Sequence, residues 1–138
     1  MRNIVLATFL ALLALAALPH AADSANWSMY SVNKGEAYLY DQDSIKSTGQ
    51  SVQVWTRLVM GTKSIDEIAN MLGKKYENVT YSNYLEELQC SEKKIRILAI
   101  VFYSKDNDAI EYINYNDPKW VAIPPETVFD RLHREVCK

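Results

Sequence analysis

CSEKKIRILAIVFY, residues 90–103, decides the fold of this chain. From Ile95 to Tyr103 the stretch is apolar except for Arg96, which predicts a strand buried at the centre of a sheet. The polar residues Ser91-Glu92-Lys93 predict a turn, and Cys90 ends a preceding strand that begins at Thr80. Two long neighbouring strands and a short turn between them predict an antiparallel hairpin.

Period-two patterns extend the sheet in both directions along the chain. The clearest is Ser51–Met60, in which Val54 and Thr56 share one face while Trp55 and Arg57 share the other. Both faces are partly apolar, so a central position is predicted. Other strands are expected at Trp27–Val32, Ala37–Tyr40, Ser44–Lys46, Ala109–Tyr115 and Trp120–Ile123.

Two segments have the 3.6-residue period of helices. Ser64 and Glu67 have capping-box spacing, so a short helix is expected over Ser64–Leu72. Pro124-Pro125 is expected to start a C-terminal helix. Its apolar stripe is Val128, Phe129, Leu132 and Val136, and its polar side is Asp130, Arg131, Arg134 and Glu135. The fold class predicted is α+β, with a mainly antiparallel sheet covered on one face, a short inserted helix and a C-terminal helix.

The N-terminus has the pattern of an export signal. Arg2 precedes an apolar run of about 15 residues from Ile4 to Leu18, shorter than the roughly 20 of a spanning helix. We expect a signal peptide over 1–22 and a single domain over 23–138; an uncleaved anchor is the rival interpretation. No second apolar stretch of spanning length follows, so no transmembrane segment is expected after signal removal. No cysteine lies near the cleavage region, so the protein is not expected to be a lipoprotein.

Cys90 and Cys137 are the only two cysteines. An exported protein with one such pair is expected to form a disulfide, here between a strand end and the end of the last helix. The alternative is a redox-active pair, but the Cys-x-x-Cys spacing that tunes thiolates is absent.

Composition argues against several classes of function. Arg2 is the only charged residue of the signal, so the rest of the chain has 14 basic and 17 acidic side chains and a net charge of −3. A nucleic-acid-binding protein is expected to carry a basic patch, so this charge argues against that class. His133 is the sole histidine after the signal, so neither a zinc site nor a histidine-based catalytic set is expected, and no cofactor is predicted. Only carboxylates remain for an enzyme: Asp41 and Asp43 could project together from a turn, whereas Glu86 and Glu87 are expected on opposite faces of one strand. Solvated side chains are the simpler interpretation.

Two groups of residues are candidates for a binding surface. Lys93, Lys94 and Arg96, extended by Lys74 and Lys75, would form a small basic patch, unless they are only a solvated turn. Tyrosine is favoured at interfaces, and exposed tyrosines such as Tyr81 and Tyr112 would form a recognition surface, although sheet packing explains most tyrosines equally well. The tyrosines considered are Tyr30, Tyr38, Tyr40, Tyr81, Tyr84, Tyr112 and Tyr115.

The order of several short motifs resembles the surface-adhesin protein E family. The motifs are Trp27, Tyr38-Leu39-Tyr40-Asp41, Asp43-Ser44-Ile45, Val52-Gln53-Val54-Trp55-Thr56-Arg57, Cys90-Ser91-Glu92-Lys93-Lys94-Ile95-Arg96, Trp120-Val121-Ala122-Ile123-Pro124-Pro125-Glu126-Thr127 and Val136-Cys137. The similarity spans nearly the whole of the chain after the signal.

The resemblance implies a sheet of about six antiparallel strands, with the C-terminal helix held on its concave side by the Cys90–Cys137 disulfide. It also implies a non-enzymatic protein that contacts host matrix and serum proteins and forms a homodimer. Members such as the Haemophilus adhesin are lipoproteins, whereas this chain lacks the cysteine for lipidation, so a periplasmic or secreted location is expected. The alternatives are an envelope-associated structural or chaperone-like accessory that shares only the fold, and a carboxylate-based hydrolase.

Overall fold

The computed structural model describes residues 25–138, so the expected signal over 1–22 lies outside the described residues. Eight strands, two α-helices and two 3-10 helices are described over this range. In chain order they are β1 (Trp27–Asn33), β2 (Glu36–Asp41), η1 (Gln42–Ser44), β3 (Lys46–Thr48), β4 (Ser51–Val59), α1 (Thr62–Leu72), η2 (Lys74–Tyr76), β5 (Val79–Gln89), β6 (Lys94–Ser104), β7 (Ala109–Asn114), β8 (Val121–Ala122) and α2 (Val128–Val136).

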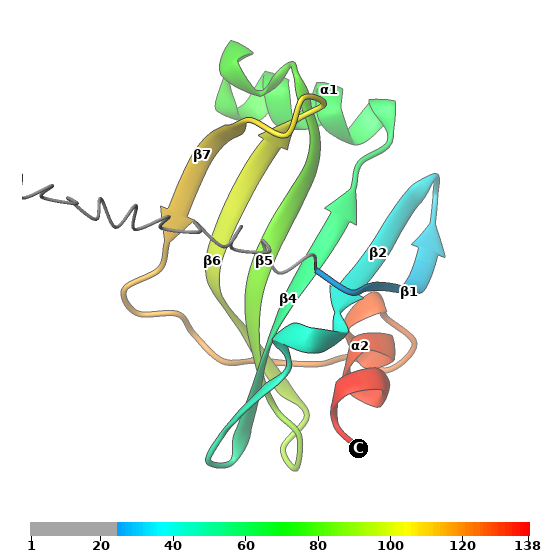
Figure 1. The fold of residues 1–138 in the computed structure, drawn as a ribbon, viewed down its shortest axis with the longest axis vertical. Helices are drawn as coiled ribbons and strands as arrows, with labels where there is room; N and C mark the ends of the chain where they lie inside the picture. Colours follow the sequence, from blue (N-terminus) through cyan, green and yellow to red (C-terminus); the bar gives the residue numbers. More distant parts are fainter. Residues whose placement is uncertain (1–24) are drawn as a thin grey trace, which may run out of the picture.

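All strand pairs within this range are antiparallel, in the order β1-β2-β4-β5-β6-β7 (Figure 1). The short strands lengthen two edges: β3 pairs with the first half of β4, and β8 with the start of β6. The predicted strand over Ile95–Tyr103 is β6, between β5 and β7. The α+β class and the six-stranded antiparallel path are confirmed.

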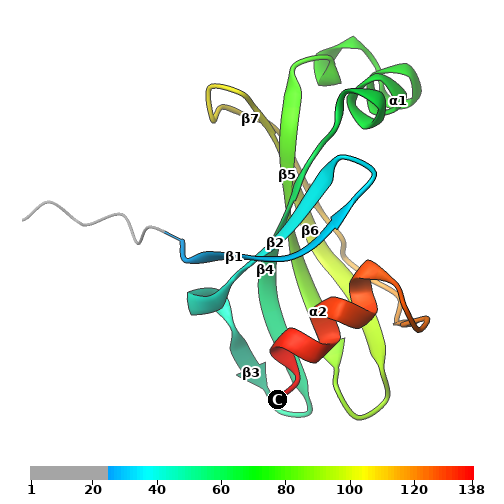
Figure 2. The ribbon, with the colours of Figure 1, turned by 90° about the vertical axis from the view of Figure 1, so that its right-hand side faces the viewer.

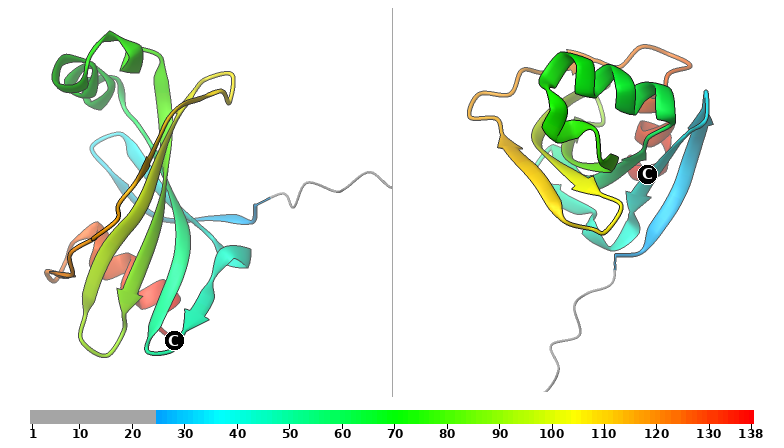
Figure 3. Two further views of the ribbon diagram at one scale, coloured as in Figure 1. Left: turned by 90° about the vertical axis from the view of Figure 1, so that its left-hand side faces the viewer. Right: turned by 90° about the horizontal axis from the view of Figure 1, so that it is seen from above.

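Both α-helices lie on one side of the curved sheet, the concave side (Figures 2 and 3). α2 covers the end formed by the β5–β6 hairpin, and α1 lies at the other end (Figure 1). Neither helix covers the convex side. The predicted sheet with one covered face is therefore present.

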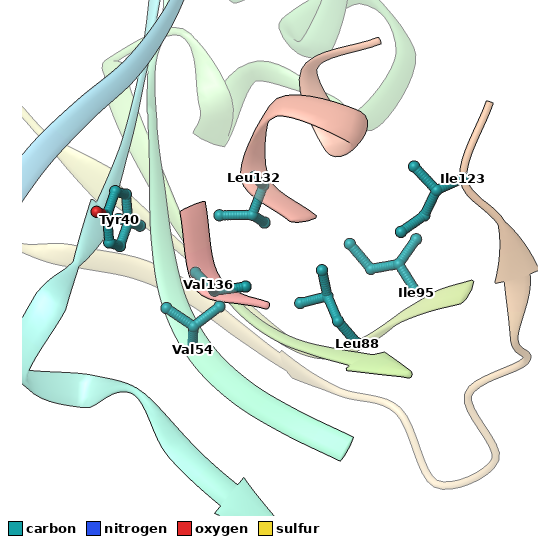
Figure 4. Packing of buried hydrophobic residues seen from close by; sticks show 7 residues of the cluster. All are labelled: Tyr40, Val54, Leu88, Ile95, Ile123, Leu132 and Val136. Carbon is teal, nitrogen blue, oxygen red and sulfur yellow. The ribbon is translucent and has the colours of Figure 1, made fainter. Parts of the chain in front are cut away.

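Two apolar clusters fix the helices in place. Under α2, a cluster joins Leu132 and Val136 to side chains of β2, β4, β5, β6 and the segment after β8 (Figure 4); its buried members are Tyr40, Val54, Leu88, Ile95, Ile123, Leu132 and Val136. Under α1, Ile65 and Ile68 pack on a second cluster formed by Met60, Tyr76, Val79 and Phe102. Burial of several large apolar side chains in each cluster, at about 1.5–3 kcal/mol per side chain, drives both helices onto the sheet.

α2 is also held by covalent and polar contacts. Cys90 and Cys137 form the predicted disulfide, with Cα atoms 5.5 Å apart. The ring of His133 donates from Nε2 to the Cys90 carbonyl over 2.9 Å, so this histidine binds backbone next to the disulfide. At other points on the helix, Arg131 donates to Ser31 Oγ over 3.4 Å.

The starts of both helices differ from the prediction. α1 begins at Thr62 with Gly61 as N-cap, and Ser64 does not cap it. The Ser64 hydroxyl instead donates to Glu36 on β2, a tertiary contact that competes with local capping. α2 begins at Val128 rather than at the prolines, because Glu126 has φ of 63° and cannot be part of a right-handed helix.

Asp130 was predicted on the polar side of the C-terminal helix, but it is only 7% exposed. Its amide donates to Thr127 Oγ1, the N-cap, and its carboxylate accepts from the Glu126 amide over 3.2 Å. Lys93 and Arg134 add ion pairs at 3.7 and 3.4 Å. The Glu126 hydrogen bond foremost, then these cations, hold the pKa of Asp130 below its usual value.

One strand is displaced from its predicted position. The strand expected at Ser44–Lys46 lies instead at Lys46–Thr48, because η1 occupies Gln42–Ser44. Asp41 causes the shift: its carboxylate accepts from the Asp43 amide over 3.2 Å, and its carbonyl accepts from Ser44 Oγ over 2.8 Å. Such side-chain bonds stabilise a tight turn over an extended chain.

Replacing both cysteines, as Cys90→Ser with Cys137→Ser, is expected to lower the free energy of unfolding by about 4 kcal/mol. The disulfide closes a loop with a sequence separation of 47, and the loss of loop-closure entropy in the unfolded chain has about this size. Urea unfolding of both proteins, followed by circular dichroism, measures the difference. The matched control is the unaltered protein unfolded with a thiol reductant, which should lower the free energy of unfolding by a similar amount. If that free energy falls by less than about 1 kcal/mol in both cases, the disulfide does not stabilise the fold as expected.

Candidate functional site

The convex face of the sheet is the candidate binding site. Strand register places aromatic and apolar side chains of six neighbouring strands on this one surface. We use "convex face" for Trp27 and Met29 of β1, Leu39 of β2, Trp55 and Arg57 of β4, Tyr81 of β5, Tyr103 of β6 and Tyr112 of β7. The predicted sidedness of β4, with Trp55 and Arg57 on the same face, holds in the register.

Arg57 lies at the centre of the convex face between two aromatic rings. Its guanidinium carbon is 4.2 Å from the Trp27 ring centre and 4.1 Å from that of Tyr81. Nε donates to Asn83 Oδ1 over 2.8 Å, which fixes the plane of the guanidinium. Burial under the rings lowers the pKa of Arg57 from its usual value, although the group stays charged at neutral pH. The result is a rigid cation–π stack.

Tyrosines extend this stack across β5, β6 and β7. The rings of Tyr81 and Tyr103 are stacked, with centres 4.8 Å apart and planes inclined by 14°. Tyr112 lies opposite Val101 on the same side and is 62% exposed. At the other edge Met29 is 58% exposed. Large apolar side chains thus face solvent on both flanks of the central stack.

The predicted basic cluster is divided by the fold. Arg96 reaches Glu87 on β5, with Nη2 and Nε 2.6 and 2.7 Å from Oε2, and stacks 4.3 Å from the Trp120 ring centre. Lys94 pairs with Glu92 at 2.5 Å, and Lys93 pairs with Asp130 of α2. Register sets Arg96 on the same side as Tyr81, about 20 Å away along β5.

Lys74 and Lys75 do not extend the basic cluster, contrary to the sequence expectation. Both lie in η2, which precedes β5, whereas Lys93 and Lys94 follow the end of β5. The eleven residues of β5 separate the two groups by about 35 Å. Lys75 instead pairs with Glu111 of β7 at 2.8 Å.

A groove and a smaller cavity lie on the concave side beside α2. The groove, of about 1160 Å³, is bounded by β1, α2 and the segment from Tyr115 to Thr127. The cavity, of about 280 Å³, is lined by Tyr30, Tyr38, Thr56, Arg57, Leu58, Tyr84, Glu86, Ile97, Val128 and Phe129. Tyr38, Ile97, Val128 and Phe129 line both spaces, so the cavity adjoins the groove.

Glu86 and Glu87 were expected to be solvated, but they are 3% and 6% exposed. Glu87 is buried as the partner of Arg96. Glu86 lines the cavity, and its Oε2 accepts from Thr56 Oγ1 over 3.0 Å. Burial raises the pKa of Glu86 to about 7, and the Thr56 hydrogen bond opposes this only in part. The two carboxyls point to opposite faces of β5, so they do not form an acid–base pair.

The tyrosines considered from the sequence divide between the two faces. Burial raises the pKa of Tyr30 and Tyr84, and burial with the Glu36 hydrogen bond raises that of Tyr38 to about 12. Tyr40 belongs to the core under α2, and Tyr115 lines the groove. Tyr30, Tyr38, Tyr40 and Tyr84 are thus packed on the concave side, Tyr115 is an exposed residue of the groove, and Tyr81 and Tyr112 lie on the convex face.

The other candidate carboxylates serve the N-terminal edge. The Asn26 amide donates to Asp41 Oδ1 over 2.9 Å, and its side chain reaches Asp43 Oδ1 at 3.5 Å. Across residues 25–138, the side chains of His, Cys, Asp and Glu form no group of three or more placed to hold a metal ion. None of the helices in this range is long and apolar enough to cross a membrane.

These features define the class of the protein: a curved antiparallel sheet with a disulfide-tethered C-terminal helix on one face and an open aromatic surface on the other. The sequence matches the family described as surface-adhesin protein E over residues 27–138, and the chain belongs to this family. The resemblance read from the ordered motifs is confirmed. Family membership implies an exported protein.

Solved structures support the fold. Protein E of Haemophilus influenzae superposes with a TM-score of 0.52 at 13% identity, over 78% of this chain and 87% of that one. A second crystal form of it gives 0.51 at 16%, over 78% and 91%. Protein E from a non-typeable strain gives 0.51 at 12%, over 87% and 81%. No curated protein matches the chain by sequence. At these identities the likeness concerns the fold alone.

Glu86→Gln is expected to make the protein more stable than the unaltered chain at pH 8, with little difference at pH 4. The folded-state pKa of about 7 exceeds the usual 4.5, so between these values the folded state binds the proton that the unfolded state has released. Glu86 therefore costs stability progressively as pH rises from 4.5 to 7, by about 3 kcal/mol at most. Urea unfolding at pH 4, 6 and 8 measures the change.

Glu67→Gln, which alters an exposed carboxylate of α1, is the matched control and should show no such trend. A difference between Glu86→Gln and the unaltered protein that stays constant from pH 4 to 8 would show that burial does not shift this carboxyl.

Proposed function

We propose that this chain is a non-enzymatic adhesin that binds a protein partner through the convex face. One observation carries the proposal: Trp27, Trp55 and Arg57 gather with Tyr81, Tyr103 and Tyr112 on the one side of the sheet that neither α-helix covers. Trp, Tyr and Arg are the residue types that dominate the binding energy of protein interfaces. Family membership in the surface adhesins supports the same function.

The fixed arrangement of the side chains on the convex face strengthens the proposal. The side chains stand on paired strands, and Arg57 is locked between two rings and Asn83. A preformed surface of this kind loses little conformational entropy on binding. Of the five binding residues predicted from the sequence, Tyr81 and Tyr112 lie in this surface, and Lys94 and Arg96 lie at its far end by register. Lys93 belongs to the contacts of α2.

The partner we propose is a host extracellular-matrix or serum protein, as the family resemblance implies. We further propose a cleaved signal at 1–22, one domain over 23–138, release to the periplasm or medium without a lipid anchor, and a homodimer. Mass spectrometry of the exported protein tests the cleavage and lipidation, and sedimentation equilibrium tests the dimer.

A second candidate function is a chaperone-like or structural accessory in the cell envelope. The groove beside α2 favours it, because apolar side chains such as Val121, which is 61% exposed, and Phe129 line that groove. An extended segment of a client would fit a groove of about 1160 Å³ next to strand β1. The convex face and the groove can be altered separately.

The decisive variant is Met29→Ser with Tyr112→Ser, which removes two exposed apolar side chains from the flanks of the convex face. Binding to a panel of immobilised matrix and serum proteins is expected to weaken about tenfold or more, as for loss of interface anchors. Surface plasmon resonance against each panel member measures the affinities.

The matched control is Met71→Ser, which changes a side chain on α1 that is 76% exposed and should leave binding unaltered. If Val121→Ser weakens binding instead, the groove is the interface and the accessory function is favoured. Absence of binding to every panel protein would refute the adhesin proposal.

A further inference from the structure

Glu86 has no ionic partner among the described residues that line its cavity. Besides Glu86, the only charged residue in that lining is Arg57, whose guanidinium lies on the opposite face between Trp27 and Tyr81. The carboxyl receives one hydrogen bond recorded in the structure, from Thr56. Buried charges in proteins are ordinarily paired. The Glu86 carboxyl therefore lies in the cavity without a cationic side chain to pair with it.

The walls around Glu86 suit a cation with an apolar body. Tyr30, Tyr38 and Tyr84 contribute aromatic rings with polar ends, and aromatic faces attract cations. Leu58, Ile97 and Phe129 supply apolar surface. A small-molecule site has this composition: mostly apolar, with a few polar groups that fix orientation.

Size and access set the class of ligand. A cavity of about 150 Å³ holds benzene, so about 280 Å³ accommodates one ring with a short charged arm. The adjoining groove offers a path from solvent, because the two spaces share four lining residues. Larger cations do not fit the cavity, although a flexible one would extend into the groove.

We propose that this cavity is a binding site for a small organic cation, a primary ammonium on an apolar body, with the Glu86 carboxylate as its counter-ion and the three tyrosines around the charge. The site lies on the concave side, opposite the convex face, and is independent of the adhesin proposal. An ammonium would give Glu86 the ionic partner that the chain itself does not provide.

The test uses two probes of the same shape, benzylammonium and benzyl alcohol, titrated into the purified protein at pH 8 and followed by heteronuclear NMR. Benzylammonium is expected to bind at least about tenfold more tightly than the alcohol, because only the cation can pair with the carboxylate. Resonances of Thr56, Tyr84 and Glu86 should shift. Equal affinities, or no binding of benzylammonium at millimolar concentration, would overturn the proposal.

Two variants locate the site. Glu86→Gln keeps the shape and the Thr56 hydrogen bond and should weaken benzylammonium binding at least about tenfold while leaving the alcohol unaffected. Glu126→Gln removes a carboxylate at the rim of the groove and should have no more than a twofold effect. If Glu126→Gln abolishes binding and Glu86→Gln does not, the cation binds in the groove and the proposal is wrong.

Binding should also weaken as pH falls from 8 to 6, because protonation of Glu86 removes the counter-ion. The other titratable groups that face Glu86 are the phenols of Tyr30 and Tyr84, with Tyr38 and its partner Glu36 beyond them, and Arg131 of α2 in the groove. Burial raises the pKa of all three tyrosines, so their phenols stay protonated in this range. Affinity in Glu86→Gln should not vary with pH; an equal pH dependence in this variant would contradict the role of Glu86 as the counter-ion.

Discussion

The structure depends on the docking of α2 against the concave side of the sheet. Leu132 and Val136 enter the core between β2, β4, β5 and β6, while the disulfide fixes the end of the helix next to the β5–β6 turn. A nine-residue helix is too short to be stable alone. Tertiary packing and the covalent link therefore keep it folded, and its position decides which side of the sheet is core and which stays uncovered.

Much of this architecture could be predicted because the signals are local. Alternation over Ser51–Met60 and the apolar run over Ile95–Tyr103 identify the two central strands, and the turn at Ser91-Glu92-Lys93 joins β5 to β6. The errors arise where tertiary contacts override local preference. Ser64 binds Glu36 instead of capping α1, and the positive φ of Glu126 delays the start of α2.

The candidate site could be predicted only in part for the same reason. Tyr81 and Tyr112 were identifiable as interface types on strands, and register brings them to one side. The Glu87–Arg96 pair could also be predicted from the hairpin register, because a turn centred between Ser91 and Glu92 sets these two residues opposite each other. The burial of Glu86 had no local signal: it requires α2 to cross β5 at that position.

The position of α2 helps to explain both why Glu86 is buried and how the fold tolerates a buried carboxyl. Val128 and Phe129 form one wall of the cavity, so α2 contributes to the burial of Glu86. Keeping a carboxyl with a raised pKa costs about 3 kcal/mol at neutral pH and above. The disulfide contributes about 4 kcal/mol by restricting the unfolded chain. Because domains are stable by only about 5–15 kcal/mol, a covalent link of about 4 kcal/mol is large enough to offset the cost of this buried carboxyl. The disulfide thus compensates for the buried acid, and the convex face, built on alternate residues of the same strands, is covered by neither helix.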